Sequence, residues 1–382
     1  MIGIYLHIPF CKSKCSYCDF YSTASQSLVQ PVVMAMLRET ERRKNYFLLA
    51  KNSFSDAQQA TLYVGGGTPS LLPPDMLNAL AQKAMATFCA APPVEFTVEL
   101  NPDDVTPEYL LRLRGMGVNR VSIGVQSFFD DDLQRLNRRH TAQQAVSSVA
   151  LAQKAGFGNI SVDLMYGLPC MDTERWRSNL ETVFSLGIQH LSAYALTIEE
   201  RTPFGALLRK NRLLLPPESE LAMQYDLLCA MSAKNGFVHY EISNFALNGF
   251  FSAHNAAYWQ QQPYVGIGPA AHSYNGRQRQ CNVASSAQYI KNMEEDKDFF
   301  EVENLSKENR YNEYVFTGLR TMWGINLSHL KQTFDKELIN YLLANANKHI
   351  ENENIAVNGD RLTIPEDRWF VADSIIVDLI WA

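Results

Sequence analysis

The segment HIPFCKSKCSYCDFYS, residues 7–22, places three of the chain's seven cysteines within a short stretch. Cys11, Cys15 and Cys18 are separated by three residues and then by two, and aromatic residues stand around them. A disulfide framework, a zinc site and an iron–sulfur cluster are three explanations of such a group. The rest of the sequence is needed to choose among them.

The composition is that of a globular protein. The chain has 382 residues, of which 46% are hydrophobic and 19% charged, which is enough for one large domain and a smaller one. The formal net charge of −6 gives no electrostatic footprint for nucleic acid. No basic leader runs into an apolar stretch, and no apolar run is long enough to span a bilayer. We therefore expect no signal peptide and a cytoplasmic protein.

The remaining cysteines do not suggest disulfides. Cys89, Cys170, Cys229 and Cys281 lie far apart, and the total number of cysteines is odd. A reducing compartment is the setting that fits this usage.

Six short apolar segments, rich in β-branched and aromatic residues, predict strands. They cover residues 3–8, 61–65, 95–100, 120–125, 159–166 and 190–196. Helical segments stand between them, and this alternation predicts a parallel sheet with right-handed crossovers. Six units are too few for a closed eight-stranded barrel. We therefore predict an α/β fold built on a partial (β/α)6 TIM-like barrel that is open on one side.

Polar motifs follow the predicted strands. GGGTPS ends the second, ELNPD the third and GVQSF the fourth, while the fifth contains Asp163. In parallel barrels this face holds the active site. A carboxylate there is costly without a partner, so Glu99 and Asp163 are candidates for contact with a cationic ligand. The alternative is that Glu99 caps the next helix and Asp163 pairs with Arg138.

The second half of the chain is less regular. Residues 254–276 are rich in glycine and aromatic residues and are predicted to fold back over the barrel. Residues 294–310 are charged and resemble a linker, and NGDRLTIPEDR, residues 358–368, predicts a hairpin. We expect a barrel with its extension over residues 1–300 and a smaller helical or winged-helix-like domain over residues 301–382.

The three clustered cysteines favour an iron–sulfur site. Structural zinc sites use four ligands, usually as two pairs, and with no second pair here His7 would have to join. Three core cysteines are disfavoured because the polar KSK stretch separates the first two. Thiolates are the usual ligands of a [4Fe–4S] cluster. Three local thiolates would hold three irons and leave the fourth open.

The spacing C-x-x-x-C-x-x-C, followed downstream by GGGTPS, resembles the radical S-adenosylmethionine (SAM) superfamily. That resemblance implies a partial (β/α)6 barrel in which the open iron binds the amino and carboxylate groups of SAM. It also implies that Tyr17 packs near the adenine and that the glycine-rich loop holds the SAM amino group. Glycines suit this role because they permit close backbone approach.

A longer series of motifs resembles one branch of that superfamily. YLHIPFCKSKCSYCDF, GGGTPS, ELNPD, GVQSF, LNRRHT, DLMYGLP and GIGPAAHSY occur in this order. The series is similar to the HemN/HemW branch, which contains oxygen-independent coproporphyrinogen III oxidases and heme chaperones, and it extends over nearly the whole chain. The resemblance implies that the SAM pocket is lined by Tyr5, Gly66, Gly67, Thr68, Glu99, Gln126, Arg138, Asp163 and Ala195.

Two features make the chain more similar to the heme chaperones than to the oxidases. Asp19 and Phe20 follow Cys18, where the oxidases have a fourth cysteine, and the chain begins at the cysteine motif, where the oxidases carry a preceding segment. In addition, HNAAYW resembles an H-N-x-x-Y-W motif linked to heme binding. The resemblance implies heme contacts from four residues: His254, Asn255, Tyr258 and Trp259. The alternative is that this motif caps a turn and fills core.

Several functions follow as hypotheses. The first is a heme-binding protein that uses a SAM-liganded cluster and hands heme to a membrane-associated or respiratory partner. The second is an oxidase that acts on a porphyrinogen by radical SAM chemistry. The third is a zinc-stapled binding module without catalysis. Whether the chain is an enzyme or a homodimer stays open, as do the roles of His7 and His272.

Overall fold

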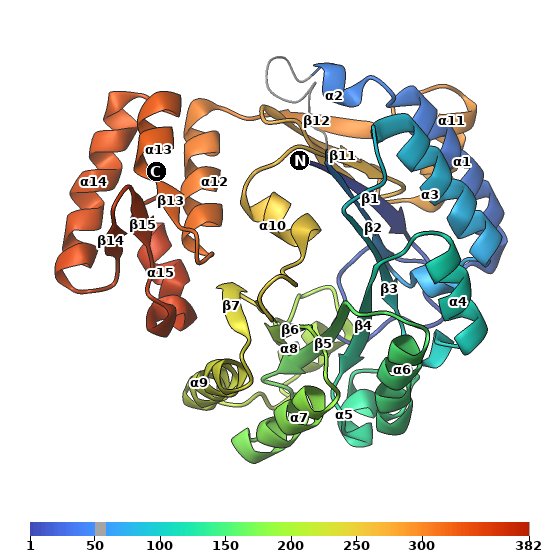
Figure 1. The fold of residues 1–382 in the computed structure, drawn as a ribbon, viewed down its shortest axis with the longest axis horizontal. Helices are drawn as coiled ribbons and strands as arrows, with labels where there is room; N and C mark the ends of the chain where they lie inside the picture. Colours follow the sequence, from blue (N-terminus) through green and yellow to red (C-terminus); the bar gives the residue numbers. More distant parts are fainter. Residues whose placement is uncertain (50–58, 382) are drawn as a thin grey trace.

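A partial barrel of six parallel strands forms the centre of the fold (Figure 1). The computed structural model describes residues 1–49 and 59–381. The six strands are hydrogen-bonded in chain order and agree with the predicted segments to within one residue at each end. They are β1 (Ile2–Ile8), β2 (Ala60–Gly66), β3 (Glu95–Leu100), β4 (Arg120–Gln126), β5 (Ile160–Tyr166) and β6 (His190–Ala195). The predicted fold class is confirmed.

Helices on the outside of the sheet connect these strands (Figure 1). Local signals fix where several of them begin. Thr106 caps α4, Thr141 forms a capping box with Gln144 at the start of α6, and Asp172 caps α7. The helices of the barrel are α1 (Val29–Arg42), α2 (Tyr46–Leu49), α3 (Pro74–Phe88), α4 (Pro107–Gly115), α5 (Asp130–Arg135), α6 (Ala142–Lys154), α7 (Thr173–Ser185), α8 (Pro203–Arg209) and α9 (Glu218–Lys234).

The two faces of the six strands differ sharply in polarity. Residues two apart on a strand share a face. One face carries buried apolar side chains such as Leu62, Val98 and Ile123. The other face carries polar side chains that the register places beside one another across four strands, including Thr61, Glu95, Thr97, Arg120, Ser122 and Ser161. The barrel interior is therefore a polar surface on which ligand-binding groups can stand.

The sheet extends beyond the barrel at both edges. At the β6 edge, β8 (Asn244–Ala246) and β7 (Val238–Glu241) add antiparallel strands. At the β1 edge, β9 (Tyr264–Ile267) pairs in parallel. Beyond β9 lie β10 (His272–Tyr274), β11 (Gln278–Asn282) and β12 (Phe300–Asn304), with α10 (Ala253–Trp259) and α11 (Ser286–Glu294) between strands in the sequence.

One expectation about this extension is confirmed in part and another is wrong. Within residues 254–276, α10 packs back against the polar interior face of β2 and β3, where His254 contacts Thr61 and Ala253 N donates to Glu95, whereas β9 and β10 widen the sheet instead of covering the barrel. Residues 294–310 are not a linker, because they contain β12 and the start of α12 (Lys307–Leu319). β12 has the sequence FEVEN and lies mostly exposed at the sheet edge, where charged residues are common. Its charge therefore gave the appearance of a linker.

The C-terminal part has the element order of a winged helix. α12 is followed by β13 (Ile325–Asn326), α13 (Leu327–Thr333), α14 (Lys336–Glu351), β14 (Ala356–Asn358), β15 (Arg361–Thr363) and α15 (Ala372–Val377). The three strands form a separate sheet in the order β13-β15-β14. β14 and β15 form the predicted hairpin. The expected domain boundary after residue 300 falls within β12.

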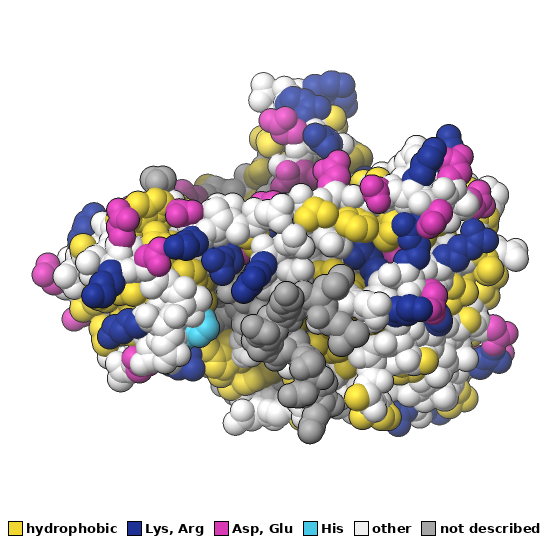
Figure 2. All heavy atoms as spheres, turned by 90° about the horizontal axis from the view of Figure 1, so that it is seen from above, with side chains coloured by type: hydrophobic (Ala, Val, Ile, Leu, Met, Phe, Trp, Pro, Cys, Tyr) yellow, Lys and Arg dark blue, Asp and Glu magenta, His cyan; other side chains and the backbone are white. Residues whose placement is uncertain are grey.

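The surface shows no separation of charge on the face in Figure 2. There, Lys and Arg side chains are interspersed with Asp and Glu side chains among the described residues. Within the described part of the chain, none of the helices combines the length and apolarity that crossing a bilayer requires.

Candidate cluster and cofactor site

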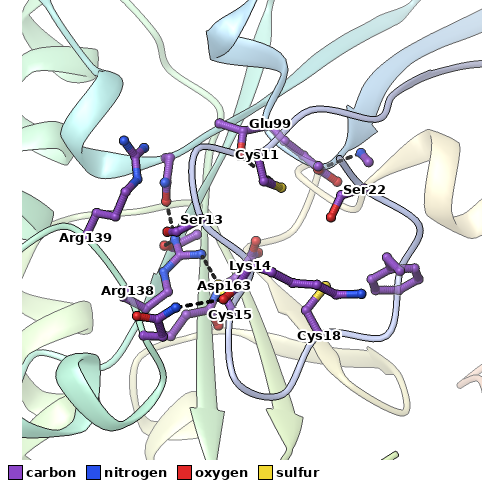
Figure 3. A pocket seen from close by; sticks show the side chains of 18 of the residues that line it. Cys11, Ser13, Lys14, Cys15, Cys18, Ser22, Glu99, Arg138, Arg139 and Asp163 are labelled. Carbon is purple, nitrogen blue, oxygen red and sulfur yellow. Dashed lines mark hydrogen bonds between the residues drawn. The ribbon is translucent and has the colours of Figure 1, made fainter. Parts of the chain in front are cut away.

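A cavity of about 450 Å³ lies where the cysteine segment meets the carboxyl ends of the barrel strands. We call it the cluster cavity. Figure 3 shows that the labelled residues around it include Cys11, Cys15, Cys18, Glu99, Arg138 and Asp163. They come from the cysteine loop, from β3 and β5, and from the turn after α5. The C-terminal face of the barrel therefore carries the site, as predicted.

Backbone hydrogen bonds hold the cysteine loop over the barrel. Thr23 N donates to Pro9 O at 2.7 Å and Cys11 N donates to Thr23 O at 3.1 Å, which closes the loop at its base. Farther along, Ser16 N donates to Leu136 O at 3.0 Å. The loop is thus fixed both to its own start and to the turn after α5.

The three thiols of this loop suit a shared iron–sulfur cluster. All three are half-buried and none forms a disulfide. Burial, with smaller contributions from the thiols of Cys15 and Cys11, raises the pKa of Cys18. Gathering thiolates here is costly unless a cation balances them, and iron supplies that positive charge. Thr68 Oγ1 lies 3.7 Å from Cys11 Sγ and adds a hydrogen-bond donor.

The structure does not bring His7 to the thiols as a fourth ligand. His7 is buried, with Nδ1 3.0 Å from the Tyr5 hydroxyl and Nε2 3.2 Å from Tyr21 O. It lines a neighbouring cavity rather than the cluster cavity. A four-ligand zinc site on this loop would need a different fourth residue.

The glycine-rich turn after β2 lets two chain segments approach closely. A Cβ atom added to Gly67 would lie 2.5 Å from Phe10 O and 2.9 Å from Cys11 Sγ. Gly66 has a φ of +115° and its N donates to Glu99 Oε2 at 3.2 Å. Only glycine fits these positions without strain. Gly67 is therefore explained by the packing of the turn against the cysteine loop, and Gly66 by its left-handed backbone conformation.

Two half-buried carboxylates, those of Glu99 and Asp163, line the cluster cavity. Burial raises the pKa of Glu99 to about 7, although the Tyr63 hydroxyl donates to its Oε1 at 2.8 Å. Burial also raises the pKa of Asp163, which accepts from Ser122 Oγ at 3.1 Å. Among the described residues neither carboxylate forms an ion pair within 4.0 Å. A cationic ligand would relieve the cost of both.

The structure contradicts both alternative roles for these carboxylates, namely a helix cap by Glu99 and an ion pair between Asp163 and Arg138. The short helix η3 (Pro102–Asp104) follows Asn101 without a side-chain cap, so Glu99 does not cap it. Arg138 donates to Asn101 Oδ1, Gly124 O and Cys15 Sγ rather than to Asp163. Both carboxylates thus stay available to a ligand.

Two further features indicate a ligand with acceptor groups. Within the described chain, Arg138 Nε is buried without a hydrogen-bond partner, and such orphaned donors are rare in folded proteins. Gln126, at a bulge in β4, has a φ of +72°, a strained value for a residue with a side chain. Backbone strain of this kind is often found at binding sites. The Arg138 guanidinium is suited to bind a carboxylate group of a ligand.

Most of the predicted cofactor residues meet in this one cavity. Its lining includes Cys11, Cys15, Tyr17, Cys18, Gly66, Gly67, Thr68, Glu99, Gln126, Arg138 and Asp163. Tyr5 and Ala195 are not in that lining: Tyr5 lines the neighbouring cavity and Ala195 ends β6. The sequence analysis missed Asn101, Ser122 and Tyr194, which also line it. Tyr194 could have been found, because it lies two residues after Ser192, which pairs with Asp163, and therefore shares the face of β6 that Ser192 is on.

The HNAAYW motif forms α10, and its histidine is enclosed. Burial lowers the pKa of His254 to about 3. Its Nδ1 lies 2.7 Å from Thr61 Oγ1, its Nε2 lies 2.9 Å from the Tyr258 hydroxyl, and its ring stacks on Tyr63 at 5.0 Å. Asn255 donates to Glu241 Oε1 at 3.1 Å. These contacts fit the alternative interpretation of the motif, in which His254 and Asn255 have structural roles in the packed interior.

The other aromatic residues of the motif differ from each other. Trp259 Nε1 is buried and lacks a hydrogen-bond partner among the described residues. Tyr258 lines a second cavity of about 700 Å³, which we call the aromatic cavity. Its lining is Tyr5, His7, Asp19, Phe20, Tyr21, Tyr258, Gln261, Tyr264, Ala270, His272, Tyr274, Arg279, Cys281, Ala284, Glu313, Phe316 and Thr317. Phe20 lines both cavities, so the two adjoin.

A partial six-stranded barrel with three loop cysteines and a glycine-rich turn is the arrangement of radical SAM proteins. The Radical SAM superfamily model matches residues 5–183, and the HemN C-terminal domain model matches residues 305–370. The solved structure of coproporphyrinogen III oxidase (HemN) from Escherichia coli superposes with a TM-score of 0.83. It shares 20% identity over 99% of this chain and 90% of that one, which shows a common fold.

Curated relatives are similar over most of their length. The heme chaperone HemW of Bacillus subtilis is 36% identical over 340 residues, 88% of each chain. HemW of Escherichia coli is 35% identical over 71% of this chain and 69% of that protein. A mitochondrial radical SAM domain-containing protein 1 of Mus musculus is 34% identical over 91% of this chain and 79% of its own. The chain belongs to the HemN/HemW branch of the radical SAM superfamily.

Membership in this superfamily implies a [4Fe–4S] cluster and SAM as cofactors. The residues of the cluster cavity fit both groups. Within the described chain, three thiols outside any disulfide line it, two half-buried carboxylates lack an ion-pair partner, and one buried guanidinium N–H lacks an acceptor. A cluster and a zwitterionic sulfonium would satisfy each of these groups.

Proposed function

We propose that the chain is a heme chaperone: it binds a [4Fe–4S] cluster, SAM and heme, and it delivers heme to acceptor proteins. The observation that carries this proposal is the 36% identity to HemW of Bacillus subtilis over 88% of both chains. Similarity spread over both parts of the chain is what a shared overall function would give.

In this proposal Cys11, Cys15 and Cys18 hold the cluster. SAM binds beside it in the cluster cavity, where Gly66, Gly67, Thr68, Gln126 and Tyr17 provide the remaining contacts. Tyr5 and Ala195 lie outside the lining and are left out of the proposal. The division at residue 300 is likewise proposed, with the C-terminal part closing one side of the aromatic cavity through Glu313, Phe316 and Thr317 of α12.

The chain's own residues have distinct tasks at the proposed site. Glu99 and Asp163 offer negative charge to a sulfonium and an ammonium, and Arg138 offers a guanidinium to a carboxylate. The polar barrel face below them keeps these groups in fixed positions through hydrogen bonds such as Ser122 Oγ to Asp163. When bound, the cluster supplies electron-transfer chemistry toward SAM.

Position 20 favours the chaperone over the oxidase. The oxidases of this branch carry a fourth cysteine there, whereas this chain has Phe20, whose side chain is 72% exposed between the two cavities. An exposed phenyl ring at that place offers apolar surface to a flat ligand. It cannot offer the thiol of the oxidase motif.

The test compares the two functions in one sample. The cluster is reconstituted anaerobically, and the protein is incubated with SAM, a reductant and coproporphyrinogen III, beside an oxidase of the same branch as positive control. We expect no decarboxylated porphyrinogen from this chain. The same preparation, loaded with hemin, should lose heme to apo-hemoproteins in respiratory membranes prepared from heme-depleted cells. Decarboxylation of the porphyrinogen would overturn the proposal in favour of the oxidase.

A further inference from the structure

The aromatic cavity has the walls that a large flat ligand needs. Seven of its lining residues are Phe or Tyr. The rings of Tyr258 and Tyr264 meet edge to face at 4.5 Å, and Tyr264 lies 6.2 Å from Tyr274. A volume of about 700 Å³ is within the range of cofactor sites. Aromatic walls of this kind bury large apolar area.

Two metal-ligating side chains stand together in this wall. His272 of β10 and Cys281 of β11 are directly opposite each other in the antiparallel pair. His272 Nε2 lies 3.5 Å from Cys281 Sγ. His272 is exposed and Cys281 is half-buried, and both line the cavity. Imidazole and thiolate both serve as ligands of heme iron in proteins.

The other two histidines near the cavity are already engaged. His7 is buried, and its two ring nitrogens contact the Tyr5 hydroxyl and Tyr21 O. His254 is buried, and its ring nitrogens contact Thr61 and Tyr258. His272 differs from both because, among the described residues, the polar contact of its Nε2 is with a thiol alone. A thiol is a weak hydrogen-bond partner and is easily displaced.

We propose that the aromatic cavity is the heme site and that His272 is an axial ligand of the heme iron. This inference rests on the proposed function, since it assigns the residues that would hold the cargo. Cys281 lies on the same strand pair and therefore on the same side of the ring as His272. It neighbours the coordinating nitrogen and does not supply the ligand on the opposite face.

The HNAAYW motif contributes to this site through Tyr258. His254 is a positioning residue, because its Nε2 contacts the Tyr258 hydroxyl and holds that ring in the cavity wall. The charges of the cavity are largely paired already, since Arg279 bridges Glu303 and Glu313. Aromatic contact and coordination, rather than charge, therefore dominate the proposed binding.

The experiment titrates hemin into the full chain after cluster reconstitution, so that the three cluster thiols are occupied. Wild-type protein should show a saturable Soret band at one hemin per chain. His272→Ala should weaken hemin binding by about tenfold or more and change the ligand-field features of the electron paramagnetic resonance spectrum. Cys281→Ser should keep the wild-type spectrum. His254→Ala should weaken binding but keep the same axial ligand.

Matched controls use an exposed histidine and an exposed cysteine outside the cavity. His329→Ala on α13 and Cys170→Ser should behave as wild type. If wild-type protein binds no hemin, the proposed function itself fails. If wild type binds hemin and His272→Ala binds it with the same affinity and spectrum, the function stands and the site assignment is overturned. A spectrum altered by Cys281→Ser instead of His272→Ala also overturns the assignment of His272.

Discussion

Arg138 Nη1 lies 3.6 Å from Cys15 Sγ, which places a half-buried guanidinium against a thiol of the cysteine loop. The same side chain spans Asn101 and Gly124 O, so it ties the loop to the ends of two strands. Its Nε faces no acceptor among the described residues. Arg138 therefore connects the proposed cluster to the proposed SAM site.

Replacement of Arg138 should change both the redox and the binding properties of the site. A donor to a cluster ligand stabilises the more negative reduced cluster, so Arg138→Ala should lower the midpoint potential. It should also weaken SAM binding by about tenfold or more, because a charge-assisted contact is lost. Arg138→Lys should have a midpoint potential and a SAM affinity between those of wild type and Arg138→Ala, because lysine keeps the positive charge but lacks the planar guanidinium. Redox titration and equilibrium dialysis measure them.

The matched control is Arg112→Ala, an exposed arginine on α4 that pairs with Asp75 and does not line the cluster cavity. It should leave the midpoint potential and SAM affinity unchanged. An Arg138→Ala protein with the potential and affinity of wild type would show that the guanidinium has only a structural role.

Gly67 should tolerate no side chain. The Cβ atom of Gly67→Ala would overlap Phe10 O, a backbone atom that cannot rotate away, and would crowd Cys11 Sγ. We expect a loss of about 1–3 kcal/mol in stability and a lower iron content after reconstitution. Thermal unfolding and iron analysis measure the two effects.

Gly115→Ala provides the control for this change. Gly115 ends α4, and an added Cβ there meets no atom within 4 Å. The substitution should be neutral or stabilise by about 0.5–1 kcal/mol, because alanine favours the helix. Equal losses in the two variants would contradict the close approach of the two loops.

Glu99 should make both stability and SAM binding depend on pH. Burial raises its pKa to about 7 from a usual 4.5. In the absence of ligand, the native state binds the extra proton between these values, so this group's contribution to stability is complete below pH 4.5 and is lost as pH rises through 7. A cationic ligand prefers the ionised form, so SAM affinity should rise over the same range.

Glu99→Gln separates these effects because it cannot ionise. The variant should bind SAM more weakly above neutrality and show a flatter dependence of affinity on pH, and its unliganded stability should fall less between about pH 5 and pH 8. Calorimetric titration of SAM at several pH values is the measurement. An affinity profile identical to that of wild type would remove Glu99 from the SAM site.

Sequence patterns predicted the barrel well because each strand is apolar and bounded by turns. They predicted the extension poorly, because strands such as β12 are short, exposed and charged. Most of the residues that line the cluster cavity could be predicted from the motifs that follow the strands. The positive φ of Gln126 and the unpaired Nε of Arg138 could not be predicted, because both depend on how distant segments of the described chain pack.

The histidines illustrate the same limit. Sequence alone left His272 open and offered His254 as a heme contact by resemblance. Their environments differ only in the folded chain, where His254 is enclosed by Thr61, Tyr63 and Tyr258 while His272 stands at a cavity wall. Burial and the hydrogen bonds of the ring nitrogens decide which histidine can reach a ligand. Neither property can be predicted from the spacing of residues in the sequence.

The electron paramagnetic resonance spectrum of the reduced, reconstituted protein, recorded with and without SAM, tests the central claim most directly. That claim is a [4Fe–4S] cluster held by Cys11, Cys15 and Cys18 with one iron open to SAM. We predict a cluster signal that shifts on addition of SAM, persists in Cys170→Ser and is lost in Cys15→Ser. A signal that is indifferent to SAM, or that survives unchanged in Cys15→Ser, would contradict the account.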